Sequence, residues 1–268
     1  MLKKLLVLTA ALAFYGESAR AEVTALPQLE TNTIQTVFDT LAASLAFKPA
    51  EGASELGNLW GLSLGVGVAM TDLSALTSLG ATTSTAYLPS GDIQIALGIK
   101  SLTFEAGMIP TLAVSGNTFS RFGAALKWTA NRTLLKKFPL SVAARALYSK
   151  ASIGYTQTDG TGTVDVDYSA SQFGAQLVTS KFLGGFGFGI EPYVGIGFLN
   201  QSSTISATGT GDLFGSSYST GTTSVSGNGL GLWLQAGLML RLGILGFSAE
   251  YDQLYGQKGF AGKVAFRF

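Results

Sequence analysis

Apolar residues alternate with small or polar residues through most of this chain, from residue 58 to the C-terminus. In the stretch 60–71, every second position is Leu62, Leu64, Val66, Val68 or Met70. Because successive side chains of a strand point to opposite faces, each such segment has one oily face and one small or polar face. We predict ten strands, near residues 58–71, 86–100, 102–113, 118–130, 139–156, 163–179, 185–200, 225–242, 245–255 and 259–268.

The composition favours a membrane barrel over a soluble β-sandwich for these strands. Only 12% of the 268 residues are charged, and the mean hydropathy is +0.35. A soluble sandwich would carry many charges on its outer faces, and its strands are usually only about five or six residues long. Since lipid offers backbone groups no hydrogen-bond partner, a sheet that crosses it must close on itself. We therefore predict an all-β fold, a closed antiparallel transmembrane barrel of about ten strands, with 8–12 as the compatible range.

The first 21 residues have the pattern of a secretory signal peptide. Lys3 and Lys4 precede an apolar run of about ten residues, and Ala19-Arg20-Ala21 forms an A-x-A cleavage site. The run is too short for a membrane-spanning anchor. We expect the mature chain to begin at Glu22.

A separate N-terminal segment, residues 22–57, precedes the barrel at 58–268. It carries an apolar stripe with helical spacing, which predicts an amphipathic helix over about 31–46 that ends before Pro49. The helix has three candidate locations: the lumen as a plug, a neighbouring subunit, or the inner leaflet of the membrane. The stripe consists of Ile34, Val37, Phe38, Leu41 and Leu45.

The C-terminal segment adds a more specific feature. Residues 259–268 place Phe260, Val264, Phe266 and Phe268 on one face and end on an aromatic residue. With the signal peptide and the ten segments, residues 58–268 resemble the bacterial outer-membrane β-barrel proteins, a class of small OmpA-like barrels and narrow porins. The resemblance implies the outer membrane of the Gram-negative envelope, membrane lipid around the barrel, and recognition of Phe266 and Phe268 by the assembly machinery.

Charged residues on the face away from lipid are candidates for a network of ion pairs in the lumen. A charge at mid-depth on the lipid face costs about 2–4 kcal/mol, and an unpaired buried charge is expensive. The same residues could instead line a selective pore, although their near balance of sign argues against strong ion selectivity. The candidates are Glu105, Arg121, Lys127, Arg145, Glu191, Arg241, Glu250 and Asp252.

Glycine is frequent on the same inward face, at positions such as Gly67, Gly195, Gly231 and Gly237. Eight-stranded barrels are just filled by their own side chains, so ten strands lined by glycine leave a channel or room for a guest. Glycine can alternatively serve to let strands bend. We favour a narrow or plugged lumen.

Two missing residue types exclude many functions. The chain contains no Cys and no His, so it has no thiolate or imidazole metal site and no Ser-His-Asp triad. The enzyme families of the resembled class also depend on a catalytic His. A net charge of +1 offers no field for nucleic acid. We therefore expect no enzyme, no catalytic residues, no cofactor and no metal.

The function expected from these observations is a structural or narrow-channel barrel, with assembly as a homo-oligomer motivated by the amphipathic helix. One alternative is a diffusion porin for small solutes. Another is a surface adhesin, in which the loop expected at Gln201–Ser224 binds a partner through Leu213, Phe214 and Tyr218.

Overall fold

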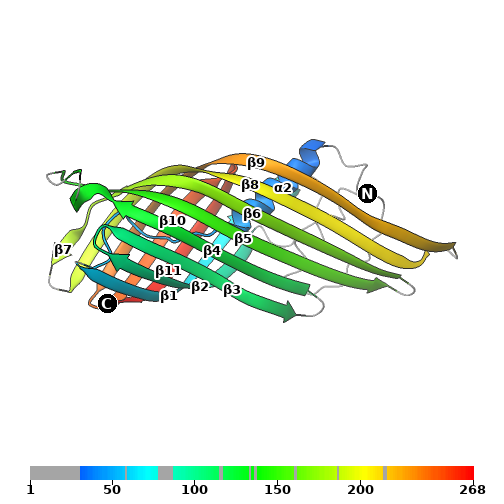
Figure 1. Ribbon diagram of the computed structural model, residues 1–268, viewed down its shortest axis with the longest axis horizontal. Coiled ribbons are helices and arrows are strands. Elements are labelled where there is room, and N and C mark those ends of the chain that lie inside the picture. Colours follow the sequence, from blue (N-terminus) through cyan, green and yellow to red (C-terminus); the bar gives the residue numbers. More distant parts are fainter. Residues whose placement is uncertain are drawn as a thin grey trace.

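Ten antiparallel strands form a closed barrel in the computed structural model of the chain (Figure 1). The structure describes residues 31–57, 59–77, 87–114, 117–132, 134–135, 138–159, 162–185, 187–213 and 216–268. The signal peptide predicted for residues 1–21 lies outside this part of the chain. The strands that form the ring are β1 (Trp60–Asp72), β2 (Tyr87–Ile99), β3 (Leu102–Val114), β4 (Asn117–Thr129), β5 (Ser141–Asp159), β6 (Gly162–Ser180), β8 (Phe188–Leu213), β9 (Ser216–Leu242), β10 (Leu245–Leu254) and β11 (Gln257–Arg267).

Neighbours in sequence pair around the ring, and two pairings complete it. The first and last strands pair, with Leu64 opposite Phe266. The second pairing joins β6 to β8. The three-residue strand β7 (Leu183–Gly185), which lies between them in sequence, pairs with β8 alone and is not part of the ring. The remaining elements are α2 (Thr31–Leu45), the short α3 (Ser74–Thr77) and the 3-10 turn η2 (Ala130–Arg132). The prediction of a closed antiparallel barrel with a short N-terminal helix is confirmed.

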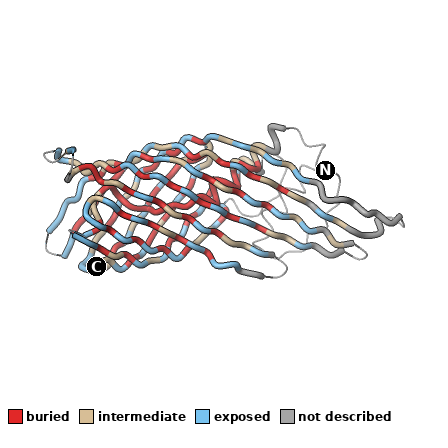
Figure 2. The backbone as a smooth tube through the Cα atoms, viewed as in Figure 1, coloured by how far each residue is buried: buried red, intermediate tan, exposed pale blue. Residues whose placement is uncertain are grey.

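The two-residue period of the sequence determines which side chains face outward. On β1, Leu64, Val66, Val68 and Met70 are 43–58% exposed, whereas Ser63, Ala69 and Thr71, at alternate positions, are buried. Figure 2 shows the same alternation of buried and exposed residues along the other strands. The exposed set is rich in Leu, Ile, Val and Phe, as expected of a face that contacts lipid.

The two ends of the barrel differ. One end, which we call the C-terminal rim, holds Phe268 and the two-residue turns Lys100–Ser101 and Gly243–Ile244. The other end, the distal rim, holds the turn Tyr255–Gly256 and the ends of β8 and β9. In Figure 1, β8 and β9 reach far beyond the other strands at the distal rim, on the side away from the C-terminus.

The prediction of a loop at Gln201–Ser224 is wrong. Strands β8 and β9, of 26 and 27 residues, instead continue as a paired ladder to Leu213 and Ser216, with a register shift near Gly209. Leu213 and Tyr218 lie in these strands, and Phe214 lies outside the described residues. Serine, threonine and glycine suggest a loop by composition, but beyond the membrane a strand needs no oily face and Thr is a good strand former. The adhesin alternative thereby loses the loop in which it placed its binding residues.

None of the helices in the described part of the chain is long and apolar enough to cross a bilayer.

Candidate functional site: a plug inside the barrel

Helix α2 and the extended chain that follows it lie inside the barrel, so the lumen is the location that the structure selects among the three candidates (Figure 1). Of the predicted stripe, Val37, Phe38, Leu41 and Leu45 are each at most 2% exposed. The side chain of Ile34 lies outside the described residues. We call residues 31–57 the plug.

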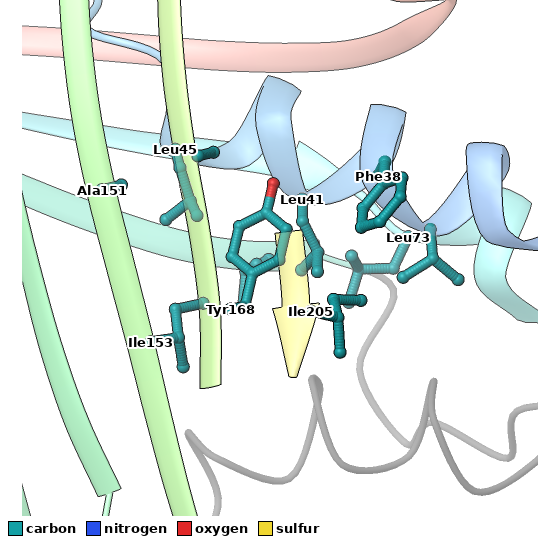
Figure 3. Packing of buried hydrophobic residues seen from close by; sticks show 11 residues of the cluster. Phe38, Leu41, Leu45, Leu73, Ala151, Ile153, Tyr168 and Ile205 are labelled. Atoms are coloured by element: carbon teal, nitrogen blue, oxygen red, sulfur yellow. The ribbon is translucent and has the colours of Figure 1, made fainter. Parts of the chain in front are cut away.

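The apolar stripe of α2 packs on inward-facing residues of the distal half of the barrel. Phe38 and Leu41 lie near Tyr168 and Ile205, and the rings of Phe38 and Tyr168 are 6.3 Å apart (Figure 3). Full burial of one such side chain contributes about 1.5–3 kcal/mol. The stripe therefore holds the helix against the wall.

The wall gives hydrogen-bond partners to the backbone of the plug. A chain that is neither helix nor strand leaves its carbonyl groups unpaired unless other groups donate to them. Lumen side chains donate to seven carbonyl oxygens in order along the plug, at 2.8–3.3 Å. The pairs are Gln172 to Ala42, Arg121 to Ala46, Gln94 to Lys48, Arg145 to Glu51, Lys127 to Gly52, Thr129 to Ala53 and Lys127 to Ser54.

Glycines of the wall make room for the bulky residues of the plug. A Cβ atom at Gly107 or Gly123 would overlap the ring of Phe47, and one at Gly98 would overlap Leu56. The inward glycines singled out from the sequence have a different role. Gly67, for example, faces Asp92 and Gln94, so wall side chains rather than the plug fill the space beside it.

Two charged residues of the plug form ion pairs with the wall. Lys48 Nζ lies 2.8 Å from Asp252 Oδ2. Glu51 Oε1 lies 2.7 Å from Lys263 Nζ and 3.8 Å from Arg267 Nη1, and its other oxygen lies 3.6 Å from Lys127 Nζ. Glu51 is 1% exposed, so these pairs are buried. Sequence reasoning missed Lys48 and Glu51, although two opposite charges close together just before the first strand were a usable signal.

Within the wall, Arg121 pairs with Asp92 at 2.6 Å. Glu105 lies between Arg145 at 3.1 Å and Lys127 at 3.5 Å. These groups share a network with Glu51, because Lys127 contacts both carboxylates.

At the C-terminal rim, Glu191 is the centre of a second cluster. Its carboxylate accepts hydrogen bonds from Ser54 of the plug and from Ser180, and it pairs with Arg241. Arg241 also stacks on Phe182, with its guanidinium carbon 4.8 Å from the ring centre. This cluster joins the end of the plug to β6, β8 and β9.

The structure thus places seven of the eight predicted lumen charges in ion pairs: Glu105, Arg121, Lys127, Arg145, Glu191, Arg241 and Asp252. The eighth, Glu250, accepts a hydrogen bond from Tyr193 Oη at 2.9 Å. Within the described residues, no three acidic side chains come together in a way that could hold a metal ion. Ion pairs, hydrogen bonds and apolar packing together hold the plug in the lumen.

Residues 16–258 match a family described as a family of unknown function, DUF6588. The chain belongs to DUF6588. No curated protein matches the sequence.

Solved outer-membrane barrels are similar to this chain at a distance. The ferric citrate transporter FecA is 10% identical over 75% of this chain, with a TM-score of 0.37, and the chain spans only 40% of the length of FecA. The translocator domain of autotransporter NalP from Neisseria meningitidis is 12% identical over 88% of this chain and 97% of its own, with a TM-score of 0.38. Ail of Yersinia pestis is 13% identical over 79% and 100% of the two chains, with a TM-score of 0.31. At these values the likenesses carry no argument about function.

Proposed function

We propose that this protein is an integral outer-membrane β-barrel with a structural role, whose lumen is kept closed by its own plug. The observation that carries the proposal is the buried set of contacts between residues 42–54 and the wall. These contacts begin at Gln172, which binds Ala42, and end at Glu191 near the C-terminal rim, which binds Ser54. A plug held in this way blocks passive diffusion. Diffusion of small solutes through the barrel would then require the plug to move. Movement of the plug would open a narrow channel.

Conductance across a planar bilayer tests the proposal. We expect the full-length protein to give no steady current above the lipid baseline. Glu51→Gln removes the carboxylate that pairs with Lys263 and Arg267 and leaves Lys127 with Glu105 alone, and breaking a buried ion pair costs about 3–5 kcal/mol. This variant should show intermittent channel openings.

Lys150→Gln is the matched control, since Lys150 is exposed and faces away from the lumen. It should remain as silent as the unmodified protein. A steady open current from the unmodified protein would overturn the proposal and favour a diffusion porin.

The outer-membrane location and the assembly partner belong to the same proposal. Phe266 on β11 and Phe268, one residue beyond its end, are 51% and 57% exposed on the lipid side, which suits recognition of this strand before the barrel closes. Membrane lipid then covers the exposed apolar band.

Assembly as a homo-oligomer remains a proposal, but the amphipathic helix no longer supports it. The helix face that motivated it is buried in its own barrel, so subunits would have to meet through lipid-facing strands. The mass of the protein in mild detergent decides this, and a single-chain mass would exclude the oligomer.

A further inference from the structure

The plug passes through the lumen in one direction, and its contacts give that direction. At its beginning, α2 lies against α3, which follows the distal end of β1, and Phe38 lies beside Gly227. Further along, Phe47 lies beside Gly107 and Gly123 at mid-height. At its end, Leu56 lies beside Gly61 and Gly98 at the C-terminal rim. The chain therefore enters the barrel at the distal rim and leaves it at the C-terminal rim.

The plug is long enough to cross the whole apolar band. A helix of 15 residues is about 22 Å long, and twelve extended residues reach at most about 40 Å. The lipid-facing band of an outer-membrane barrel is about 25 Å tall. The start of α2 at the distal rim therefore lies on the opposite side of the membrane from β1's first residue.

The connections between strands indicate which rim faces outward. Bacterial outer-membrane barrels have short turns on the periplasmic side and longer connections outside. At the C-terminal rim, Lys100–Ser101 and Gly243–Ile244 are two-residue turns, and the connections at 130–140 and 181–187 are longer but do not extend the strands. At the distal rim, the connection between Asp72 and Tyr87 is long, and the pairs β5–β6 and β8–β9, with strands of 19, 19, 26 and 27 residues, project beyond the shorter strands and carry their turns outward. The distal rim is thus the cell-surface side.

We propose that α2 begins at the cell surface, so that the chain is threaded across the outer membrane inside its own barrel and presents the N-terminal end of α2 to the outside. This inference rests on the proposed outer-membrane location. It goes beyond a structural role, because Thr31 and the C-terminal Phe268 then lie on opposite sides of the outer membrane.

Single cysteines test the inference cleanly, because the natural chain contains none. Gln28→Cys reports on the segment before the plug. Lys258→Cys, at an exposed position of β11 next to the distal turn, is the outside control, and Lys181→Cys, exposed at the C-terminal rim, is the periplasmic control. Intact cells are treated with a membrane-impermeant maleimide, and lysed and denatured samples are treated in parallel.

We expect Gln28→Cys and Lys258→Cys to be labelled in intact cells and Lys181→Cys only after lysis. Labelling of Gln28→Cys only after lysis or denaturation, with both controls as expected, would overturn the inference and leave the plugged barrel standing. So would removal of residue 28 from the mature protein, read from its intact mass.

Reversed labelling of the two controls would also overturn it, because the distal rim would then face the periplasm. Failure of both controls to label in intact cells, with labelling after lysis, would contradict the outer-membrane location itself. The conductance experiment remains a separate measure of the plug.

Discussion

Glu51 shows how far residue-level reasoning reaches in this chain. The two-residue period predicted which charged residues of the strands face inward, because each strand has one face in lipid. It did not predict which charges meet, since partners such as Lys127 and Glu105 depend on register and on the curvature of the barrel. Glu51 itself belongs to no periodic element, and its burial depends on contacts with residues more than 70 positions away.

Phe38 and Gly227 provide a test of the plug at the level of single atoms. A Cβ atom at Gly227 would overlap the ring of Phe38. We expect Gly227→Ala to lower the free energy of unfolding by about 1–3 kcal/mol, the usual cost of overpacking. In a Phe38→Val background the same change should cost much less, because the ring atoms are gone.

A double-mutant cycle of urea unfolding in detergent measures this coupling. Gly185→Ala is the control, since a Cβ atom there meets nothing within 4 Å. Equal costs of Gly227→Ala in both backgrounds would show that α2 does not lie against β9.

At the scale of elements, the strands that have a lipid-facing side could be predicted from the sequence. The distal halves of β8 and β9 could not. From Phe188 to Phe198 outward positions are apolar, so the period is visible in the sequence. Beyond Asn200 the outward positions, such as Ser202 and Ser226, are polar, and the ladder continues by backbone pairing such as Thr204 with Ser226. The helix was predictable from its stripe, but its position was not, because the wall that covers it comes from distant strands.

Hydrogen–deuterium exchange distinguishes a strand from a loop in this region. Backbone amides of residues 201–206 are paired on both sides, with β6 and with β9. We expect them to exchange as slowly as those of residues 193–198. Exchange as fast as that of the turn at Gly243–Ile244 would contradict the extended ladder.

Strand β11 is the element for which the sequence resemblance makes a functional prediction. Phe268 exchanges backbone hydrogen bonds with Leu62 and exposes its ring to lipid. We expect Phe268→Ala to reduce the amount of barrel inserted in the outer membrane, with more unfolded protein in the periplasm, while Phe260→Ala on the same face changes insertion less. Equal insertion of Phe268→Ala and the unmodified protein would remove the assembly role of the terminal residue.

At the scale of the whole molecule, the ion pairs in the middle of the lumen are kept out of water, and this determines how stability responds to salt. The pairs Lys48–Asp252 and Arg121–Asp92 have side chains at most 3% exposed. Salt screens exposed charges strongly, but buried pairs only weakly. We therefore expect the unfolding temperature in a non-ionic detergent to change little between about 0.1 M and about 1 M salt.

Circular dichroism during heating measures this, with Glu51→Gln as the comparison. A steep fall in the unfolding temperature with salt would mean that water reaches the ion pairs and that the plug is loosely seated.

The pairing of β1 with β11 has a consequence for the order of folding. These strands are the first and the last of the barrel, and β1 follows directly from the plug. The plug precedes every strand in the chain, so it is already present when the final seam between Leu64 and Phe266 forms. The barrel can close around a preloaded interior, and the plug then serves as an internal template on which the sheet acquires its curvature.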